Sequence, residues 1–493
     1  MFNNLTLINA VPGAGKTTFM INKAAELIWD KYDISEIAFV TFTKNAAQVA
    51  KDRITERLGE KRGIDAMFGK NSKRYRHFCT IHSMCFHALN ISGEDMVTAS
   101  DYQEFNEMYG YKRFYLSPEA VKYGAQCGGY DVRVMKQDNA SLLEQLAGLY
   151  RTNKHAYQEA MDGMHIARAG ITNEHVVQYM TRWEEYKKSK SDITVEEFND
   201  YKLKRGVYDY TDLLEEYVSR KLSEDIIKVA FIDEAQDLSY LQWQVLMTAF
   251  RNAEEVYAVA DPRQNMFKWA GSAVDVFLSL HGTVRTLDKN YRCRRNIVDF
   301  VNAHVVKHIE NVDGLEIHME AEREGGNVSY LYFMNDILKD EDITNPSKKV
   351  LMLAPDNIGA GVFRDWCINA CIPFTWMGSP LFTSSDKSAY VANGRNIPDS
   401  WEGEKRLVAT AYHNAGTLLA TPTIHIMTIH QAKGDEADVV VVNTDMPKKM
   451  YESFVVNPYQ TDLLFYVACT RAKDTLYIFR DATKSNARRY NRI

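Results

Sequence analysis

The feature that most restricts the fold is a loop of small residues near the start of the chain. Residues 5–8 (L-T-L-I) read as a short strand, residues 10–18 are A-V-P-G-A-G-K-T-T, and residues 19–29 read as a helix. Small residues at such a turn let backbone N–H groups approach an anion, and the lysine and threonine that follow suit phosphate oxygens and Mg²⁺. This order of elements predicts a phosphate-binding loop in a parallel α/β sheet rather than a chance glycine turn.

The predicted loop supplies residues for a phosphorylated ligand. Lys16 is expected to reach the β- and γ-phosphates, and the hydroxyl of Thr17 is expected to bind Mg²⁺. The expected set is Ala10, Pro12, Gly13, Ala14, Gly15, Lys16, Thr17 and Thr18.

A later strand ends in two carboxylates. Residues 229–232 (V-A-F-I) run into D-E-A-Q-D at 233–237. Asp233 is placed to hold Mg²⁺ through its water shell, and Glu234 is placed to orient an attacking water. Strands also end in aspartate for turn formation, so the pair gains its meaning from the phosphate loop upstream. Together the two segments predict hydrolysis of a magnesium-bound nucleotide.

Strand signals occur in two series along the 493 residues, which are too many for one hydrophobic core. The first series is 5–8, 37–40, 229–233 and 256–260, and the second is 350–354, 424–428, 437–442 and 475–479. We therefore predict an α/β protein with two parallel-sheet cores. The expected parts are 1–91 and 206–280 for the first core, 92–205 for a helical insertion within it, 281–375 and 424–493 for the second core, and 376–423 for a small irregular insertion.

Composition restricts the compartment and the class of partner. There is no run of about 18 apolar residues and no secretion signal, which argues against a membrane partner. Seven cysteines without a C-x-x-C pair indicate free thiols, so we expect the cytoplasm of a bacterium or of a virus-infected host. A net charge of −6 argues against general polyanion binding but allows a local basic groove. The basic stretch at 59–78 is either a solvated loop or a phosphate contact.

Ordered blocks along the chain resemble those of UvrD/Rep-type superfamily 1A helicases. After the phosphate loop come T-F-T-K-N-A-A (41–47), T-I-H-S (80–83), D-Y-T-D-L-L (209–214), V-A-D-P-R-Q-N-M-F-K-W-A-G-S (259–272), L-D-K-N-Y-R (287–292), M-T-I-H-Q-A-K-G-D-E (427–436) and F-Y-V-A-C-T-R-A-K (465–473). The resemblance covers nearly all of both cores and little of the inserted segments. It implies two RecA-like cores and an enzyme that uses ATP and Mg²⁺.

The resemblance also implies roles for residues of both cores in ATP hydrolysis. Gln264 would sense the γ-phosphate, Tyr291 would stack on adenine and Glu436 would bond the ribose. Arg292 and Arg471 would reach from the second core to the γ-phosphate, although either could be an ordinary structural residue. The implied catalytic set is Glu234, Asp233, Lys16, Gln264, Arg292 and Arg471; the nucleotide-binding set adds Tyr291, Gly434 and Glu436 to the phosphate loop; Thr17 and Asp233 would hold Mg²⁺.

The resemblance implies that the protein moves along a single-stranded nucleic acid. Aromatic side chains would stack on bases, which tolerates any base sequence. Phe267 and Trp269 could instead be core aromatics, and Phe42 is as plausibly a core residue as a contact residue. The implied contact residues are Thr41, Phe42, Thr43, His82, Phe267, Trp269 and His430.

The spacing C79-x2-H82-x2-C85-x-H87 resembles a metal site. Four ligands within nine residues would strain a tetrahedral site, and His82 is already explained by the T-I-H-S block.

The resemblance implies an ATP-dependent DNA helicase that moves 3′ to 5′ on single-stranded DNA and opens duplexes at single-strand/duplex junctions. Such a motor would act as a monomer, with a replication or repair protein as a further partner. One alternative is a translocase that displaces proteins or remodels junctions without processive unwinding. Another is a nucleic-acid-binding scaffold whose NTPase is only a switch. Because no glutamine-containing block precedes the phosphate loop, we expect weaker selectivity for adenine.

Overall fold

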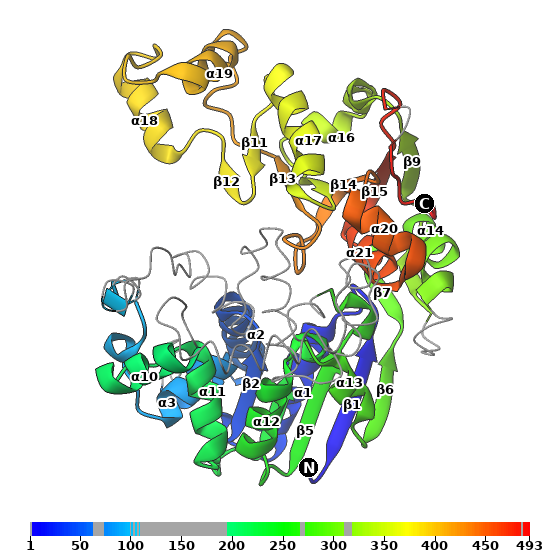
Figure 1. The fold of residues 1–493 in the computed structure, drawn as a ribbon. Helices are drawn as coiled ribbons and strands as arrows, with labels where there is room; N and C mark the ends of the chain where they lie inside the picture. The colour runs from blue at the N-terminus through cyan, green and yellow to red at the C-terminus, as the bar shows by residue number, and fades with distance from the viewer. Residues whose placement is uncertain are drawn as a thin grey trace. The chain divides into compact units, whose positions relative to one another are not determined.

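The computed structural model describes residues 2–62, 73–98, 195–266, 272–309, 318–484 and 487–493, together with residues 100, 101, 104, 105 and 108. The chain divides into two compact units (Figure 1). The first comprises Met1–Ala10 and Gly15–Leu287, and the second comprises Val11–Ala14 and Asp288–Ile493. Most of the predicted helical insertion, residues 109–194, lies outside the described residues. No described helix has both the length and the apolarity that crossing a bilayer requires.

The first unit is built on a parallel six-stranded sheet in the order β3-β2-β4-β5-β1-β6. Its strands are β1 (Leu5–Ala10), β2 (Ile37–Thr41), β3 (Phe78–Thr80), β4 (Val229–Ile232), β5 (Glu255–Ala260) and β6 (Thr283–Leu287). Every residue of β2 and β4 is buried, as expected for central strands covered on both faces. The predicted parallel α/β sheet is therefore confirmed, and the carboxyl ends of its strands define the edge where a ligand binds.

Helices and stacked aromatics complete this unit. Phe39 stacks between Phe78 and Phe231 with ring centroids 5.9 Å apart in each pair, and Phe231 stacks on Tyr257 at 5.0 Å. These rings tie β3, β2, β4 and β5 together. The helices are α1 (Lys16–Asp30), α2 (Lys44–Arg62), α3 (Ile81–Ala88), α10 (Val195–Arg205), α11 (Tyr210–Ser219), α12 (Tyr240–Ala249) and α13 (Val274–Ser279), with 3₁₀ turns η1 (Ile34–Glu36), η2 (Lys73–Tyr75), η3 (Gly93–Asp95), η4 (Ala235–Asp237) and η5 (Pro262–Gln264).

Strand β6 corrects one expected boundary. We expected residues 281–287 in the second core, but β6 pairs with β1 in the first sheet, from Thr6 opposite Thr283 to Ala10 opposite Leu287. Four of its five residues are exposed and the last is half-buried, so it lacks the apolar run by which the central strands were recognised. The first sheet therefore extends to Leu287.

The second unit contains a seven-stranded sheet in the order β12-β11-β13-β10-β14-β15-β9, and a two-stranded parallel ribbon. The sheet strands are β9 (Asn327–Leu331), β10 (Val350–Ala354), β11 (Phe374–Trp376), β12 (Ser379–Pro380), β13 (Ile424–Thr428), β14 (Ala437–Asn443) and β15 (Ala472–Phe479); the ribbon is β7 (Lys289–Arg294) with β8 (Glu320–Arg323). All pairs are parallel except β11 with β12. The second predicted parallel sheet is thereby confirmed.

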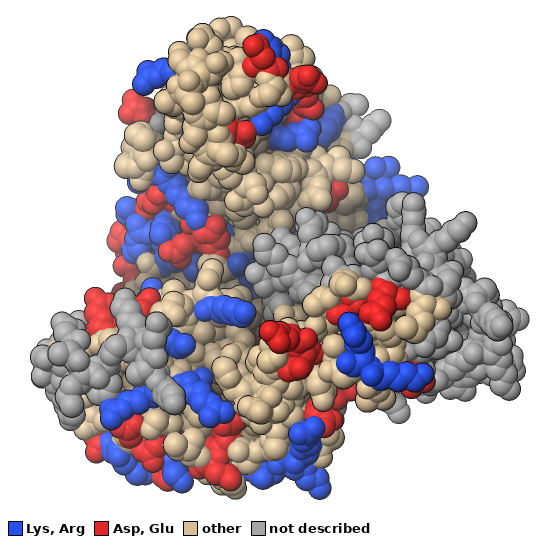
Figure 2. All heavy atoms as spheres, turned by 90° about the vertical axis from the view of Figure 1, so that its left-hand side faces the viewer, with Lys and Arg blue, Asp and Glu red and all other residues tan. Residues whose placement is uncertain are grey.

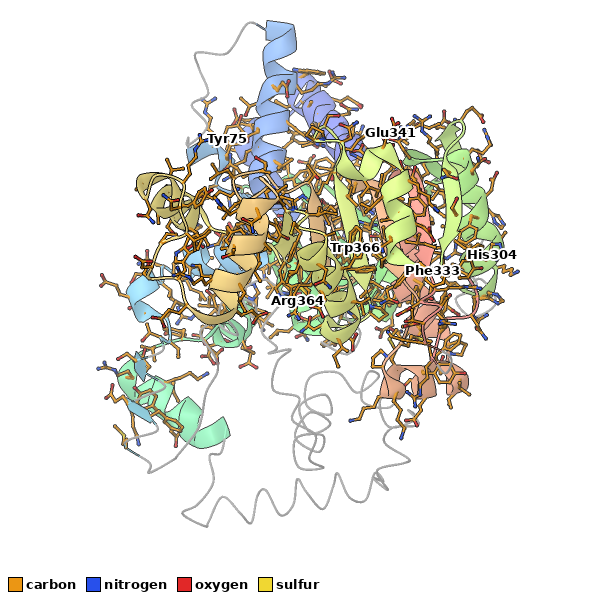
Figure 3. The ribbon with its side chains drawn as sticks, turned by 90° about the horizontal axis from the view of Figure 1, so that it is seen from above. Tyr75, His304, Phe333, Glu341, Arg364 and Trp366 are labelled. Atoms are coloured by element: carbon orange, nitrogen blue, oxygen red, sulfur yellow. The ribbon has the colours of Figure 1, made fainter. Side chains whose placement is uncertain are left out.

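The helices of the second unit are α14 (Arg295–Val301), α16 (Glu341–Thr344), α17 (Asn357–Asn369), α18 (Ser384–Ala392), α19 (Gly403–Asn414), α20 (Lys448–Val456) and α21 (Tyr459–Cys469), with the π-helical turn η7 (Asn302–Val306) and the 3₁₀ segment η8 (Met334–Lys339). Of these helices, α14, α17 and α21 contact strands of the seven-stranded sheet. On α17, Trp366 Nε1 donates to Asn335 Oδ1 (2.9 Å), and the Arg364 guanidinium lies 5.3 Å from the ring centre of Trp376 (Figure 3).

The insertion at 376–423 is more ordered than expected. It contains α18 and α19, which close on an apolar cluster of their own made of Phe382, Tyr390, Trp401, Ala409, Tyr412 and Leu418. The Tyr412 hydroxyl donates to the carbonyls of Cys367 (3.1 Å) and Ile372 (2.7 Å), and the Thr417 hydroxyl donates to that of Cys371 (2.7 Å). The prediction of an irregular element was wrong, because its aromatic residues are too widely spaced along the chain to form a recognisable helical period.

Candidate nucleotide and nucleic-acid site

The backbone of the predicted phosphate loop is shaped to receive an anion. Gly13 (φ 68°) and Gly15 (φ 73°) both adopt the left-handed conformation that glycine tolerates. Gly15 is the N-cap of α1, and no side chain of the described residues caps that helix end. The N–H groups of the first turn are therefore left for a ligand, at the positive end of the helix dipole.

The residues of the loop differ in their exposure to solvent. Ala10, Pro12 and Ala14 are buried, Gly13, Gly15, Lys16 and Thr17 are half-buried, and Thr18 is exposed.

Gly13 belongs to the second unit, where neighbouring atoms leave no room for a side chain at this position. A β-carbon there would lie 2.5 Å from the β-carbon of Arg292, and the Gly13 carbonyl accepts from the N–H of Tyr291 (3.0 Å). Glycine is thus required at 13 for both conformation and space.

Two buried carboxylates at the ends of β4 and β5 interact with the loop lysine. Burial and the neighbouring charge of Glu234 raise the pKa of Asp233 to about 7, while the ammonium of Lys16 opposes the rise. Burial likewise raises the pKa of Asp261, again against the charge of Lys16. Carboxylates that resist ionisation in the free protein and face a lysine fit a site that receives a divalent cation and phosphate together.

Glu234 has a strained backbone. Its φ of 50° and ψ of 42° lie in the left-handed region, which costs a non-glycine residue roughly 1–3 kcal/mol. Its N–H donates to Asp233 Oδ1 (2.9 Å), and its carboxylate accepts from Gln236 Nε2. Strain of this kind persists where the surrounding structure fixes the residue, and it is concentrated at functional sites.

A hydrogen-bonded chain runs from β4 to β5. Gln236, which is fully buried, bonds Glu234 through Nε2 and accepts from the Asp261 N–H through Oε1 (3.1 Å). Asp261 in turn accepts from Gln264 Nε2 (2.8 Å). The structure therefore joins Glu234 and Gln264, which are far apart in sequence. We did not predict Asp261, although its place directly after a buried strand is the same signal that identified Asp233.

In the second unit, Arg292 is held by two acceptors from the last two sequence blocks. Its Nε donates to Glu436 Oε2 (2.6 Å) and its Nη1 donates to the carbonyl of Thr470 (3.2 Å). Burial opposes ionisation of Glu436, but the hydrogen bond from Lys473 and the charge of Arg292 outweigh it and lower its pKa to about 2. The pairing of Arg292 with Glu436 brings together two residues that the sequence assigned to the nucleotide.

The other predicted nucleotide residues of this unit differ in exposure. Tyr291 is 56% exposed, so its ring is accessible to a ligand. Arg471 is 1% exposed and donates to the carbonyls of Val467 (3.1 Å) and Asp435 (3.3 Å). Gly434 has φ 83°, which glycine adopts without strain. The structure thus places Arg471 in a backbone-bonded, buried position that the sequence did not suggest.

The predicted nucleic-acid residues of the first unit follow β2 and β3. Thr41 is buried and its hydroxyl donates to the Thr43 carbonyl (2.9 Å), while Phe42 and Thr43 are half-buried. Among the described residues on the face drawn in Figure 2, acidic and basic side chains are interspersed. Phe267 and Trp269 lie outside the described residues. In the second unit, burial lowers the pKa of His430 to about 4.

His82 carries an uncompensated polar atom. The Thr80 hydroxyl caps α3 by accepting from Ser83 N–H (3.3 Å), which places His82 in the first turn, edge-on to Tyr210 at 5.4 Å between ring centroids. Its ring is buried, and Nε2 has no hydrogen-bond partner among the residues that the structure describes. Burial lowers its pKa to about 4, so the ring is neutral near pH 7. A buried, unsatisfied ring nitrogen costs about 1–3 kcal/mol, so Nε2 is a candidate contact for a ligand or a water.

Replacing His82 by phenylalanine should therefore stabilise the free protein and weaken the response to single-stranded DNA. The ring contact with Tyr210 remains, while the unsatisfied nitrogen is removed, so we expect the free energy of unfolding at pH 7.5 to rise by about 1 kcal/mol. Denaturant unfolding and DNA-stimulated ATPase measure the two effects.

The pH dependence of stability gives an independent check on His82. The folded pKa lies below the ordinary 6.5, so protonation of His82 does not reduce folding stability above pH 6.5, and the stability falls as the pH drops towards 4, by up to roughly 3 kcal/mol. His82→Phe should flatten that part of the profile, and exposed His281→Phe should not. Equal profiles for wild type and His82→Phe would show that His82 is not buried and neutral.

The neighbouring cysteines are part of the apolar core. Cys79 and Cys85 belong to the core cluster of the first unit, and burial raises the pKa of Cys79 to about 12, which disfavours the thiolate that a metal requires. Within the described residues, no group of three or more His, Cys, Asp and Glu side chains is arranged to hold a metal ion.

Comparison with known proteins gives matches to both ends of the chain. Residues 1–285 match the UvrD/REP helicase N-terminal domain, and residues 407–482 match the UvrD-like helicase C-terminal domain. Among similar proteins, the "ATP-dependent DNA helicase Rep" of Buchnera aphidicola is 23% identical over 378 residues, which is 73% of this chain and 49% of the relative.

A second relative matches a smaller share of the chain. The "Probable DNA helicase II homolog" of Mycoplasma capricolum is 24% identical over 313 residues, or 60% of this chain and 38% of the relative. The chain thus spans half or less of the length of these two relatives. Because the N-terminal domain match at residues 1–285 covers more than half of the 493 residues, the chain belongs to the UvrD/REP helicase family.

Proposed function

We propose that the chain is an ATP-dependent DNA helicase or translocase that uses ATP hydrolysis to move 3′ to 5′ on single-stranded DNA. The observation that carries this proposal is the chain of contacts Glu234–Gln236–Asp261–Gln264 in the first unit, whose Asp261 interacts with Lys16. Such a chain suits a protein in which hydrolysis at one residue changes the conformation of another segment.

The residues at the loop fit a magnesium-bound nucleotide. The uncapped N-terminus of α1 and Lys16 would bind the phosphates, and Thr17 and Asp233 would hold Mg²⁺, which supplies positive charge against the phosphate oxygens. The carboxylate of Glu234, whose backbone is strained, would accept the proton of the attacking water. Gln264 would report the γ-phosphate through Asp261 and Gln236.

Residues of the second unit would complete the reaction. Arg292 would exchange Glu436 for the γ-phosphate, where a planar guanidinium stabilises the charge that phosphoryl transfer builds. Glu436 keeps its bond to Lys473 (2.8 Å) and so stays ionised and available to the ribose. Arg471 would add a second guanidinium, and exposed Tyr291 would stack on the base.

Unwinding and direction are tested together with tailed duplexes. We expect strand separation of a 3′-tailed duplex, little of a 5′-tailed duplex, and none with Lys16→Ala, because that variant lacks the cation that contacts the β- and γ-phosphates. A fluorescence-quench assay with and without ATP measures this. Preference for the 5′ tail would overturn the proposed direction.

A protein-displacement assay separates the two motor alternatives. If streptavidin is removed from a biotinylated 3′ end while no duplex opens, the chain is a translocase without unwinding activity. If single-stranded DNA fails to stimulate ATP hydrolysis and neither substrate responds, the switch-like scaffold is favoured. RNA oligonucleotides of the same sequence serve as the comparison track.

A further inference from the structure

The ribbon that carries Tyr291 and Arg292 is irregular. In the β7–β8 pair, Asn290 lies opposite Ala321 and Arg294 lies opposite Arg323, with a shift of register between the two pairs. Between them β7 has Tyr291, Arg292 and Cys293, whereas β8 has a single residue. The two residues proposed to act on the nucleotide therefore stand on a bulge, a device that redirects side chains near active sites.

The N–H side of this bulge is fixed by Asn290. Its Oδ1 accepts from the N–H of Arg292 (2.9 Å) and from that of Cys293 (2.7 Å). The Asn290 side chain is fully buried, so these bonds are shielded from water. The bulge is thus closed by a side chain in place of the missing strand partner.

The carbonyl side is fixed by Arg323 of β8. Its Nη1 donates to the carbonyl of Arg292 (2.5 Å) and its Nη2 donates to Asp474 Oδ1 (2.7 Å). The same oxygen of Asp474 accepts from Arg294 Nε (2.7 Å). Because Asp474 lies on β15, Arg323 anchors the backbone of Arg292 to the seven-stranded sheet.

The backbone and the side chain of Arg292 are therefore held differently. The peptide groups on either side are fixed by Asn290 and Arg323, whereas the guanidinium bonds Glu436 and the Thr470 carbonyl, partners that a phosphate can replace. We infer that Arg323 is a positioning residue for Arg292, keeping its backbone in place while the side chain changes partner. This inference rests on the proposed role of Arg292 in ATP hydrolysis.

Arg323→Gln tests the inference in DNA-stimulated ATPase. A backbone displaced by about 1 Å can cost up to about a hundredfold in rate, so we expect kcat to fall about ten- to a hundredfold with KM for ATP changed less than about threefold. Arg323→Lys, which can still donate to one acceptor, should recover part of the loss. Arg295→Gln is the matched control, since Arg295 makes a similar ion pair, with Glu324 (2.6 Å), and its bond to the ribbon goes to the Ala321 carbonyl (3.5 Å) on β8 and not to Arg292.

A double-mutant cycle separates positioning from a general loss of structure. In an Arg292→Ala background, Arg323→Gln should lower kcat no further, because there is no guanidinium left to position. Additive losses, or an unchanged kcat in Arg323→Gln alone, would overturn the inference. If Arg323→Gln does not fold, Asp474→Asn, which loosens the same anchor, takes its place in the cycle. Full activity of Arg292→Ala would overturn both the inference and the proposed role of Arg292.

Discussion

Replacing Glu234 by glutamine should reduce the DNA-stimulated turnover of ATP by about 10²- to 10⁴-fold, the range typical for loss of a general base. Glutamine keeps the size of the side chain and an oxygen that can accept from Gln236, but it cannot take a proton. Nucleotide affinity should be nearly unchanged, because Lys16 and the loop N–H groups remain. Steady-state ATPase and binding of a fluorescent nucleotide measure the two quantities separately.

A second substitution at Glu234 separates chemistry from backbone strain. Glycine adopts the φ of 50° found at Glu234 without cost, so Glu234→Gly should increase the free energy of unfolding by about 1 kcal/mol while turnover stays lost. Wild-type turnover in Glu234→Gln would remove this residue from the catalytic set. Reduced stability in Glu234→Gly would show that the side chain is structurally required.

Replacing Arg292 by alanine should lower kcat by about 10³-fold or more, as expected for loss of an arginine that stabilises charge on a transferring phosphoryl group. The fold should survive, because Glu436 still bonds Lys473 and is not left as an unpaired charge. Arg292→Lys should recover little, since an ammonium cannot reproduce the planar fork of donors. Single-turnover ATP hydrolysis measures the chemical step directly.

The matched control for Arg292 lies on the next element. Arg295 is also an arginine in an ion pair, but its partner Glu324 is exposed and neither has a proposed role in hydrolysis. Arg295→Ala should therefore keep kcat within about twofold, because exposed ion pairs contribute little. Equal losses in both alanine variants would point to a nonspecific effect of removing charge from this part of the second unit.

The elements that could be predicted from the sequence are the buried ones. Strands β2, β4 and β10 are buried along their whole length, and β14 is buried at all but one residue, so each is a largely apolar run in the sequence. Strand β6 was missed because four of its five residues are exposed, and β7 was missed because its sequence, K-N-Y-R-C-R, is mostly polar. Edge strands and ribbons are stabilised by backbone pairing, which leaves no apolar period in the sequence.

The same distinction holds for the candidate site. Lys16 begins the helix after the glycine loop, and Asp233 and Glu234 come directly after β4, so all three could be located by position in the chain. The contact between Gln236 and Asp261 depends on β4 lying beside β5. No single segment of the sequence predicts the order of the strands in the sheet. Arg323 has no sequence signal at all, since an arginine near the end of a short polar strand is ordinary until its bond to the Arg292 carbonyl is seen.

The insertion at 376–423 is fastened to the C-terminal end of α17, where Tyr412 and Thr417 bond the carbonyls of residues 367, 371 and 372. A pull on this insertion would therefore be transmitted along a helix that packs on β10 and β13, and would not be absorbed by slack in the connecting chain. The insertion is therefore mechanically coupled to the seven-stranded sheet of the second unit. A force applied to the insertion by a bound partner would act on that sheet, and a displacement of the sheet would move the insertion.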